Sequence, residues 1–200
     1  MDKMPFGGLT RSDLGVPLKN HFYLCMQKPF KFHPEVDTLF CGIMTKDPDG
    51  WLVLHQEQPH HRLLALYREA AVVLDSYPAG GDTTTREVIE MGKPLVTLPA
   101  RLLGGRWSLG YLSNIGLKED TKRALIASTP EEYVDLAVQL GTDDTLREAV
   151  EADLRECSSN LFHREEAVAA WQEMFLEISP YQRCQEGSEN EEVLHEHEEL

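Results

Sequence analysis

The chain has 200 residues, of which 42% are hydrophobic, and its formal net charge is −15. This length and composition support one substantial core. The acidic balance argues against nucleic acid as a partner, because nucleic acid binds clusters of Lys and Arg. No apolar run approaches the ~20 residues of a membrane span, and the N-terminus lacks the basic-then-apolar order of a signal peptide. We therefore expect a soluble intracellular protein, cytoplasmic or nuclear, with no membrane partner.

Much of the negative charge lies at the C-terminus. Residues 181–200 contain seven glutamates and one arginine, and few apolar side chains. We expect residues 1–180 to form the globular domain and residues 181–200 to be a disordered acidic tail. His195 and His197 flank a glutamate and could bind a metal weakly, but a solvated chain end is the favoured interpretation.

The first part of the chain alternates short apolar strands with helices, as in a parallel sheet covered on both faces. Strands are predicted at 21–26, 51–54, 71–75 and 94–97, and helices at 34–44, 60–69 and 84–91. Further helices are predicted at 130–140, 144–157 and 165–178. The fold class is therefore α/β, a Rossmann-like parallel sheet with helices on both faces, followed by C-terminal helices. In such sheets ligands gather outside the carboxyl ends of the strands.

The four cysteines are scattered along the chain and show no Cys-x-x-Cys spacing. They are Cys25, Cys41, Cys157 and Cys184. Cys25 lies in an apolar strand, where a free thiol behaves as a small hydrophobic side chain. We expect neither a disulfide nor a metal site.

A Gly-rich turn ending at Gly81 leads into a helix that begins with Thr83, Thr84 and Thr85. Threonine hydroxyls and free N–H groups at the positive end of a helix make a suitable seat for a phosphate or diphosphate. Glu87, one turn further on, could accept hydrogen bonds from ribose hydroxyls. The alternative is a capping box without ligand, in which Thr84 and Glu87 satisfy each other's backbone donors.

The run from Gly80 to Pro99 resembles the donor-binding segment of the protein O-linked N-acetylglucosamine transferases, glycosyltransferase family 41. The shared features are the Thr-Thr helix start, an acidic residue in the helix, and Gly-x-Pro-x-Val-Thr-x-Pro. Upstream, the apolar strand followed by Gln27 and Lys31 fits the same family. Further matches lie at 102–112, 129–137 and 159–163, so that the resemblance covers residues 11–180.

The resemblance implies the second lobe of a two-lobed GT-B glycosyltransferase. Such an enzyme transfers N-acetylglucosamine from UDP-GlcNAc to Ser or Thr hydroxyls of proteins, with inversion at the anomeric carbon and without a metal or other cofactor. Lys31 is implied as the catalytic residue that contacts the donor diphosphate, with Gln27 beside it. An ammonium group and a helix N-terminus stabilise the negative charge of the leaving diphosphate. Glu87 would hold the ribose.

Only the donor-binding lobe is recognisable, and residues 1–9 are too few to supply the first one. The chain is therefore interpreted as a fragment, a truncated product or a stand-alone lobe. A non-catalytic nucleotide-sugar-binding or protein-interaction module is the alternative. An epimerase of similar architecture is disfavoured by the joint presence of the Gln27–Lys31 spacing and the threonines, whereas a nucleotide-fucose transferase stays open.

Three features depart from the family pattern. Asp82 stands where relatives have His or Cys; its carboxylate would cap the helix and repel a diphosphate. His60 replaces a lysine and could meet a phosphate if protonated. Residues 55–59 are too few for the helix and strand that relatives place there, so we expect a lost strand or a different closure of the sheet.

His33 is expected to mark a helix start rather than to act as a general base.

Overall fold

The structure is a computed structural model that describes residues 10–54, 59–162 and 164–178. The chain divides into two compact units, Met1–Phe162 and His163–Leu200. The predicted acidic tail, with His195 and His197, lies outside the described residues, and so do the predicted boundary after residue 180 and Cys184. The tail prediction therefore stays a prediction.

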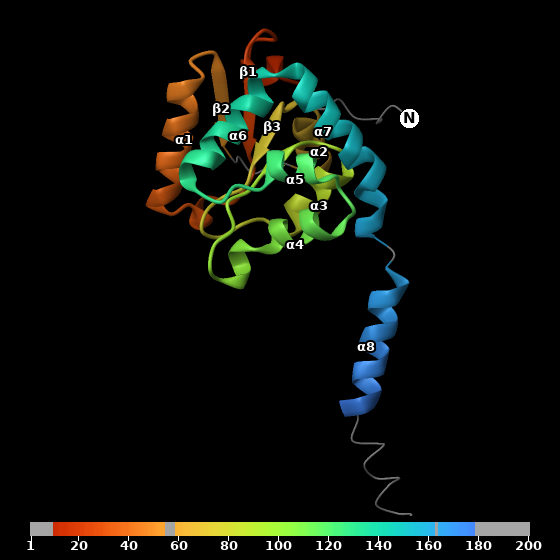
Figure 1. Cartoon of the computed structure of the whole chain (residues 1–200). Coiled ribbons are helices and arrows are strands. Elements are labelled where there is room, and N and C mark those ends of the chain that lie inside the picture. Colours follow the sequence, from red (N-terminus) through yellow and green to blue (C-terminus); the bar gives the residue numbers. More distant parts are fainter. Residues whose placement is uncertain (1–9, 55–58, 163, 179–200) are drawn as a thin grey trace, which may run out of the picture. The chain divides into compact units, whose positions relative to one another are not determined.

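A parallel sheet forms the centre of the first unit (Figure 1). Its strand order is β2-β1-β3-β4, and every neighbouring pair is parallel. The bounds are His21–Cys25 for β1, Gly50–Leu54 for β2, Val72–Leu74 for β3 and Leu95–Val96 for β4. All four predicted strands are present, each within two residues of its predicted ends, and the predicted fold class is confirmed.

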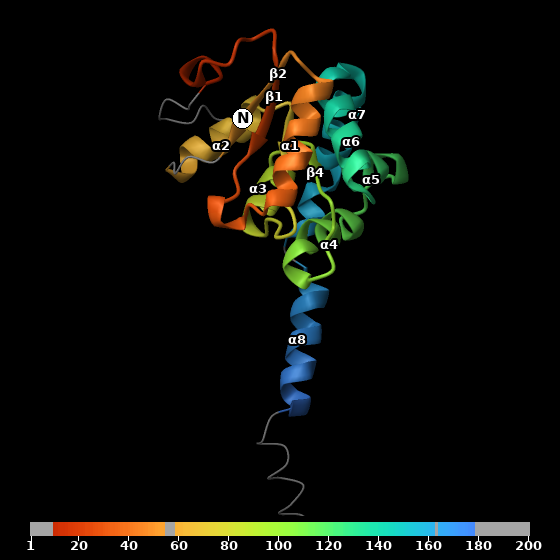
Figure 2. The same cartoon turned by 90° about the vertical axis from the view of Figure 1, so that its left-hand side faces the viewer.

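Helices cover both faces of the sheet. Figure 2 shows α2 (His60–Glu69) and α3 (Thr83–Glu90) on one side, and α6 (Pro130–Thr142) on the other. The remaining helices of this unit are α1 (Pro34–Lys46), α4 (Trp107–Asn114), α5 (Glu119–Leu125) and α7 (Asp144–Cys157). Among the described residues, no helix combines the length and the apolar character needed to cross a membrane.

Helix α6 shows why the sequence folds in this way. Its N-terminus is fixed by Pro130 in the first turn and by Thr129, whose hydroxyl accepts a hydrogen bond from the N–H of Glu132 at 3.1 Å. Helical spacing then places apolar side chains on one buried face, and this face packs on β1, β3, β4 and α1: Tyr133, Val134, Ala137 and Leu140. α6 therefore holds the sheet and the first crossover helix together.

The strand order reverses beside β1. The chain moves from β1 to β2 on one side, whereas β3 pairs with β1 on the other side. Such a switch point leaves a crevice outside the carboxyl ends of the two strands, and ligands of open α/β sheets bind there. Gln27 and Lys31 follow the end of β1, and Gly81 follows the end of β3. The topology therefore brings the predicted site residues to one edge of the sheet.

Two features differ from the sequence prediction or extend it. The short helix α5 and the 3₁₀ turns were not predicted, since seven residues or fewer carry too little periodicity to be recognised. The segment 55–58, on which the expected change of the sheet depends, lies outside the described residues. In the described part of the chain the sheet has four strands, with β3 directly beside β1.

Candidate anion site at the carboxyl edge of the sheet

The Lys31 side chain lies at the centre of the site. It follows β1 on a 3₁₀ turn, Pro29–Lys31, and its Nζ donates hydrogen bonds to Oε1 of Gln27 and to the carbonyl oxygen of Gly80, each at 2.9 Å. Neither acceptor carries a charge. Within the described part of the chain, no carboxylate lies within ion-pair distance of this ammonium. The edge of the sheet therefore carries a positive charge that none of the described side chains neutralises by an ion pair.

Gln27 connects the end of β1 to the first turn of α3. Its Nε2 donates to Oγ1 of Thr84 at 2.7 Å, while its Oε1 accepts from Lys31. The side chain is only 6% exposed, so both of its contacts are fixed by packing. Gln27, Lys31 and Thr84 thus converge, as their positions after two neighbouring strands predict.

The N-terminus of α3 is open. The helix begins at Thr83, and Asp82 is its N-cap residue, but no side chain caps the first N–H groups. These groups have no acceptor within the helix. The capping box considered for Thr84 and Glu87 is wrong, because the Thr84 hydroxyl accepts from Gln27 and the Glu87 carboxylate contacts His60. The positive end of α3 is therefore available to an anion.

Asp82 does not cap α3, contrary to the sequence prediction. Its Oδ1 accepts a hydrogen bond from the Tyr111 hydroxyl and lies 3.3 Å from Nε of Arg86, with which it forms an ion pair. Burial, together with this hydrogen bond, raises the pKa of Tyr111 to about 12, so the phenol keeps its proton and donates. Tyr111 and Arg86 hold the carboxylate, and Arg86 offsets the repulsion that Asp82 would exert on an anion.

Glu87 and His60 form a second pair in the site. Nε2 of His60 lies 2.9 Å from Oε1 of Glu87; the histidine side chain is 66% exposed and the glutamate 17%. The other carboxylate oxygen, Oε2, is buried and has no hydrogen-bond partner within the described residues. The Glu87 carboxylate on α3 therefore contacts His60 through Oε1, whereas its Oε2 is enclosed by the protein.

The three threonines differ in their exposure. Thr83 is exposed and Thr84 is half-buried, whereas Thr85 is fully buried. The Thr85 hydroxyl donates to the carbonyl oxygen of Gly81 at 3.1 Å and lies 2.9 Å from Oγ of Ser108. Thr85 thus holds the turn in place, and only Thr83 and Thr84 offer hydroxyls near the open helix end.

The sequence analysis overlooked Asp75, which is only 3% exposed. Its Oδ1 accepts from the N–H groups of Ser76 at 3.0 Å and Gly81 at 2.8 Å. Its Oδ2 accepts from the hydroxyls of Thr97 at 2.9 Å and Ser108 at 2.6 Å. Burial raises the pKa of Asp75, and these four hydrogen bonds oppose the shift. A carboxylate directly after a buried strand, at the switch point, is the signal that could have identified it.

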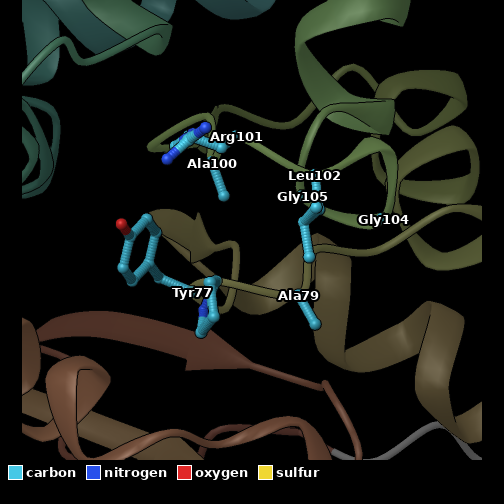
Figure 3. A pocket seen from close by; sticks show the side chains of 8 residues that line it. Tyr77, Ala79, Ala100, Arg101, Leu102, Gly104 and Gly105 are labelled. Atoms are coloured by element: carbon cyan, nitrogen blue, oxygen red, sulfur yellow. The ribbon is translucent and has the colours of Figure 1, made fainter.

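A cavity of about 370 Å³ opens beside this network. Figure 3 shows the chain after β3 and the chain after β4 facing each other across it. The two segments are joined by a hydrogen bond from the N–H of Gly80 to the carbonyl oxygen of Gly104 at 2.9 Å. None of the residues predicted to bind the donor lines the cavity, whose wall is mostly apolar and includes one charged side chain, Arg101.

Two further predictions concern a histidine and a metal. His33 is the N-cap residue of α1, and its Nδ1 accepts from the N–H of Glu35 at 3.4 Å, so its expected role at a helix start is confirmed. In the part of the chain that the structure describes, no group of three or more His, Cys, Asp or Glu side chains is arranged to hold a metal ion.

Comparison with known proteins decides the family. The model of glycosyl transferase family 41 matches residues 52–170, more than half of the chain. The chain belongs to glycosyl transferase family 41. This match includes α3, the strand that follows it and the C-terminal helices of the first unit. The family assignment made from the sequence is therefore confirmed.

Two curated relatives share this region. One is a probable UDP-N-acetylglucosamine–peptide N-acetylglucosaminyltransferase SPINDLY of Petunia hybrida, 34% identical over 97 residues, or 48% of this chain and 10% of the relative. The other, a UDP-N-acetylglucosamine–peptide N-acetylglucosaminyltransferase of Caenorhabditis elegans, is 39% identical over 74 residues, or 37% of this chain and 6% of the relative. The matched part of this family 41 chain thus spans a tenth or less of either relative.

Solved structures agree with the family. A mutant of the O-GlcNAc transferase of Thermobaculum terrenum superimposes with a TM-score of 0.68 and 26% identity, over 78% of this chain and 36% of that one. The glycotransferase of kitacinnamycin superimposes with a TM-score of 0.50 and 16% identity, over 86% of this chain and 46% of that one. The second similarity supports the fold alone. The described lobe is thus one part of a glycosyltransferase architecture.

Proposed function

We propose that this family 41 lobe binds the UDP moiety of a UDP-sugar donor, UDP-N-acetylglucosamine. We further propose that it serves the transfer of N-acetylglucosamine to Ser or Thr hydroxyls of proteins in the cytoplasm or nucleus. The names of the curated relatives and the similarity to an O-GlcNAc transferase support the donor and the acceptor class. The topology supports the place of binding, because the site lies at the switch point of the sheet.

The position of the Lys31 ammonium is the observation that carries this proposal. The group lies 2.9 Å from the Gly80 carbonyl oxygen, three residues before α3 begins, and its partners are neutral. A diphosphate bound here would meet a cation and the positive end of a helix together. Both favour the negative charge that develops on the leaving diphosphate, so Lys31 would assist bond cleavage as well as binding.

The remaining site residues would place the rest of the nucleotide. Thr83 and Thr84 offer hydroxyls at the helix end, and the Glu87 carboxylate would accept a hydrogen bond from a ribose hydroxyl. His60, paired with Glu87 and exposed, would contact the donor from α2. The proposal assigns charge neutralisation to the Lys31 ammonium and to the positive end of α3, without a metal cofactor.

Calorimetry with UDP tests the proposal. Lys31→Ala removes one charged contact to the diphosphate, worth about 1.5–3 kcal/mol, so UDP affinity should fall roughly ten- to hundredfold. Lys28→Ala is the matched control, because Lys28 is an exposed lysine in the same segment and has no ion pair in the described structure. Uridine, which lacks the diphosphate, should bind equally to the wild type and to Lys31→Ala.

Equal UDP affinity in Lys31→Ala and the wild type would contradict the proposal, and so would a wild type that does not bind UDP. A transfer assay with UDP-GlcNAc and an acceptor peptide then separates catalysis from binding. Binding with turnover supports the transferase. Binding without turnover supports the alternative drawn from the sequence, a nucleotide-sugar-binding module.

A further inference from the structure

One peptide group in the site is held at both ends by charged side chains. The Gly80 carbonyl and the Gly81 N–H belong to the same planar unit. Nζ of Lys31 donates to the carbonyl oxygen at 2.9 Å, and Oδ1 of Asp75 accepts from the N–H at 2.8 Å. The orientation of this one plane therefore links a buried carboxylate to the proposed diphosphate-binding ammonium.

The carboxylate end of this link is rigid. Oδ2 of Asp75 is held by the hydroxyls of Thr97 and Ser108. The backbone of Asp75 is held as well, because its N–H donates to the carbonyl of Val96 at 3.0 Å and its carbonyl accepts from the Tyr133 hydroxyl at 2.8 Å. These contacts join Asp75 to β4, α4 and α6 and fix its position. Its Oδ1 can therefore hold the turn after β3 through the N–H of Gly81.

The peptide group itself has no comparable rigidity. It joins two glycines, which visit more backbone conformations than any other residue, so its plane can turn unless something holds it. A half-turn would point the Gly80 carbonyl away from Lys31 and bring the Gly81 N–H toward the ammonium. The hydrogen bond to Asp75 opposes that turn. A charge at each end also polarises the peptide and strengthens both hydrogen bonds.

We propose that Asp75 is a positioning residue for Lys31, acting through the Gly80–Gly81 peptide. It fixes the plane of that peptide so that the carbonyl oxygen receives the ammonium and holds it at the tip of α3. This role rests on the proposed function insofar as Lys31 binds the donor diphosphate. The hydrogen-bonded link itself does not depend on a ligand, and it can be tested in the free protein.

The first test uses the amide signal of Gly81 in the ¹⁵N-labelled full chain without nucleotide. If Lys31 polarises the peptide, Lys31→Ala should move the Gly81 amide proton upfield and speed its exchange with solvent. Lys28→Ala should leave it unchanged. An unchanged Gly81 signal in Lys31→Ala would overturn the proposal, whether or not the protein binds UDP.

The second test uses UDP affinity. Asp75→Ala removes the acceptor for Gly81 and should lower the affinity at least tenfold. Asp75→Asn keeps one oxygen that can accept from the N–H groups of Ser76 and Gly81, so its UDP affinity should lie within about threefold of the wild type. A small deficit is expected because a neutral acceptor makes a weaker hydrogen bond than a carboxylate. Thr97→Val is the control, because it removes one contact to Oδ2 and leaves the peptide link intact.

The two tests separate the possible failures. If Thr97→Val loses as much affinity as Asp75→Ala at equal thermal stability, Asp75 has only a general structural role and the proposal is overturned. If Asp75→Ala does not fold, the first test alone decides the proposal: a shifted Gly81 amide signal in Lys31→Ala supports it, and an unchanged signal overturns it. A wild type without UDP affinity refutes the proposed function, and the amide test then still supports or overturns the link.

Discussion

At the scale of single residues, the site depends on a glycine, Gly81, whose backbone lies in close contact with neighbouring side chains. Gly81 is packed against the Gln27 amide and the hydroxyls of Thr84 and Thr85, which occupy the space that a Cβ would need. The same glycine donates its N–H to Asp75. A glycine is required here for close approach rather than for an unusual φ.

Gly81→Ala should therefore damage the site more than the fold. The added methyl group would push the Gln27 amide away from Thr84 and disturb the contact of Gln27 with Lys31. We expect UDP affinity to fall at least tenfold, about 1.4 kcal/mol or more. Calorimetry measures the affinity, and circular dichroism checks that the variant is folded.

Gly110→Ala is the control for this substitution. Gly110 lies in α4, where a Cβ would meet no atom within 4 Å, so the variant should bind UDP as the wild type does. Its stability should rise by up to about 1 kcal/mol, because alanine favours the helix. A similar loss of UDP affinity in both variants would contradict the packing argument.

At the scale of elements, the sequence predicted the strands and the longer helices because their apolar periodicity is strong. β1 and α6 illustrate this: four of the five residues of β1 are buried, and α6 has a proline and a threonine cap at its start. The short α5 gave no such signal. The convergence of Gln27, Lys31 and Thr84 followed from their places after neighbouring parallel strands.

Other details of the site could not be predicted from the sequence, because they depend on contacts between residues that lie far apart in the chain. Asp82 is drawn away from the N–H groups of α3 by Tyr111 and Arg86, and Tyr111 lies in another helix. Asp75 accepts hydrogen bonds from residues as far away in the sequence as Ser108, 33 positions on, and Tyr133, 58 positions on. A sequence shows the donors and acceptors of such a network but not which of them meet.

Asp153 joins α7 to the start of α5 and offers a test of stability at this scale. It is 3% exposed, accepts from the N–H of Lys118 at 3.0 Å, and lies 3.4 Å from the Lys118 ammonium. Burial raises the pKa of Asp153, but hydrogen bonds from Thr121 and Lys118 outweigh this, so its pKa lies below the usual 3.8.

Asp153→Asn should lower the free energy of unfolding by about 1–3 kcal/mol at pH 7. Because folding lowers this pKa, the stabilisation is present above pH 3.8 and is lost as the pH falls through the folded-state value. Urea unfolding at several pH values should show the deficit of the variant shrinking below pH 4. Asp120→Asn, at a 98% exposed side chain, should have no deficit at pH 7. A deficit that does not change with pH would contradict this account of Asp153.

At the scale of the whole molecule, all core residues in the part of the chain that the structure describes belong to the first unit. The core cluster runs from Val16 to Cys157, and no residue of α8 (Glu165–Ile178) is buried. All residues of the candidate site also lie in the first unit. The unit Met1–Phe162 should therefore fold and bind without the rest of the chain.

A truncation after Phe162 tests this expectation. The melting temperature should change by less than about 4 °C, corresponding to roughly 1 kcal/mol or less for a protein of this size. UDP affinity should stay within about twofold of the full chain, less than 0.5 kcal/mol. A larger loss of either would mean that residues 163–200 contribute to the fold or to the site.

The central claim is that an anion binds at the carboxyl edge of the sheet, between Lys31 and the start of α3. Titration of the ¹⁵N-labelled chain with UDP, followed by amide signals, tests it most directly. We predict saturable shifts at Gln27–Lys31, His60 and Gly80–Glu87, while His21 and Asp47, at the opposite edge, stay unchanged. Shifts centred on that opposite edge, or no saturable shift at all, would contradict the account.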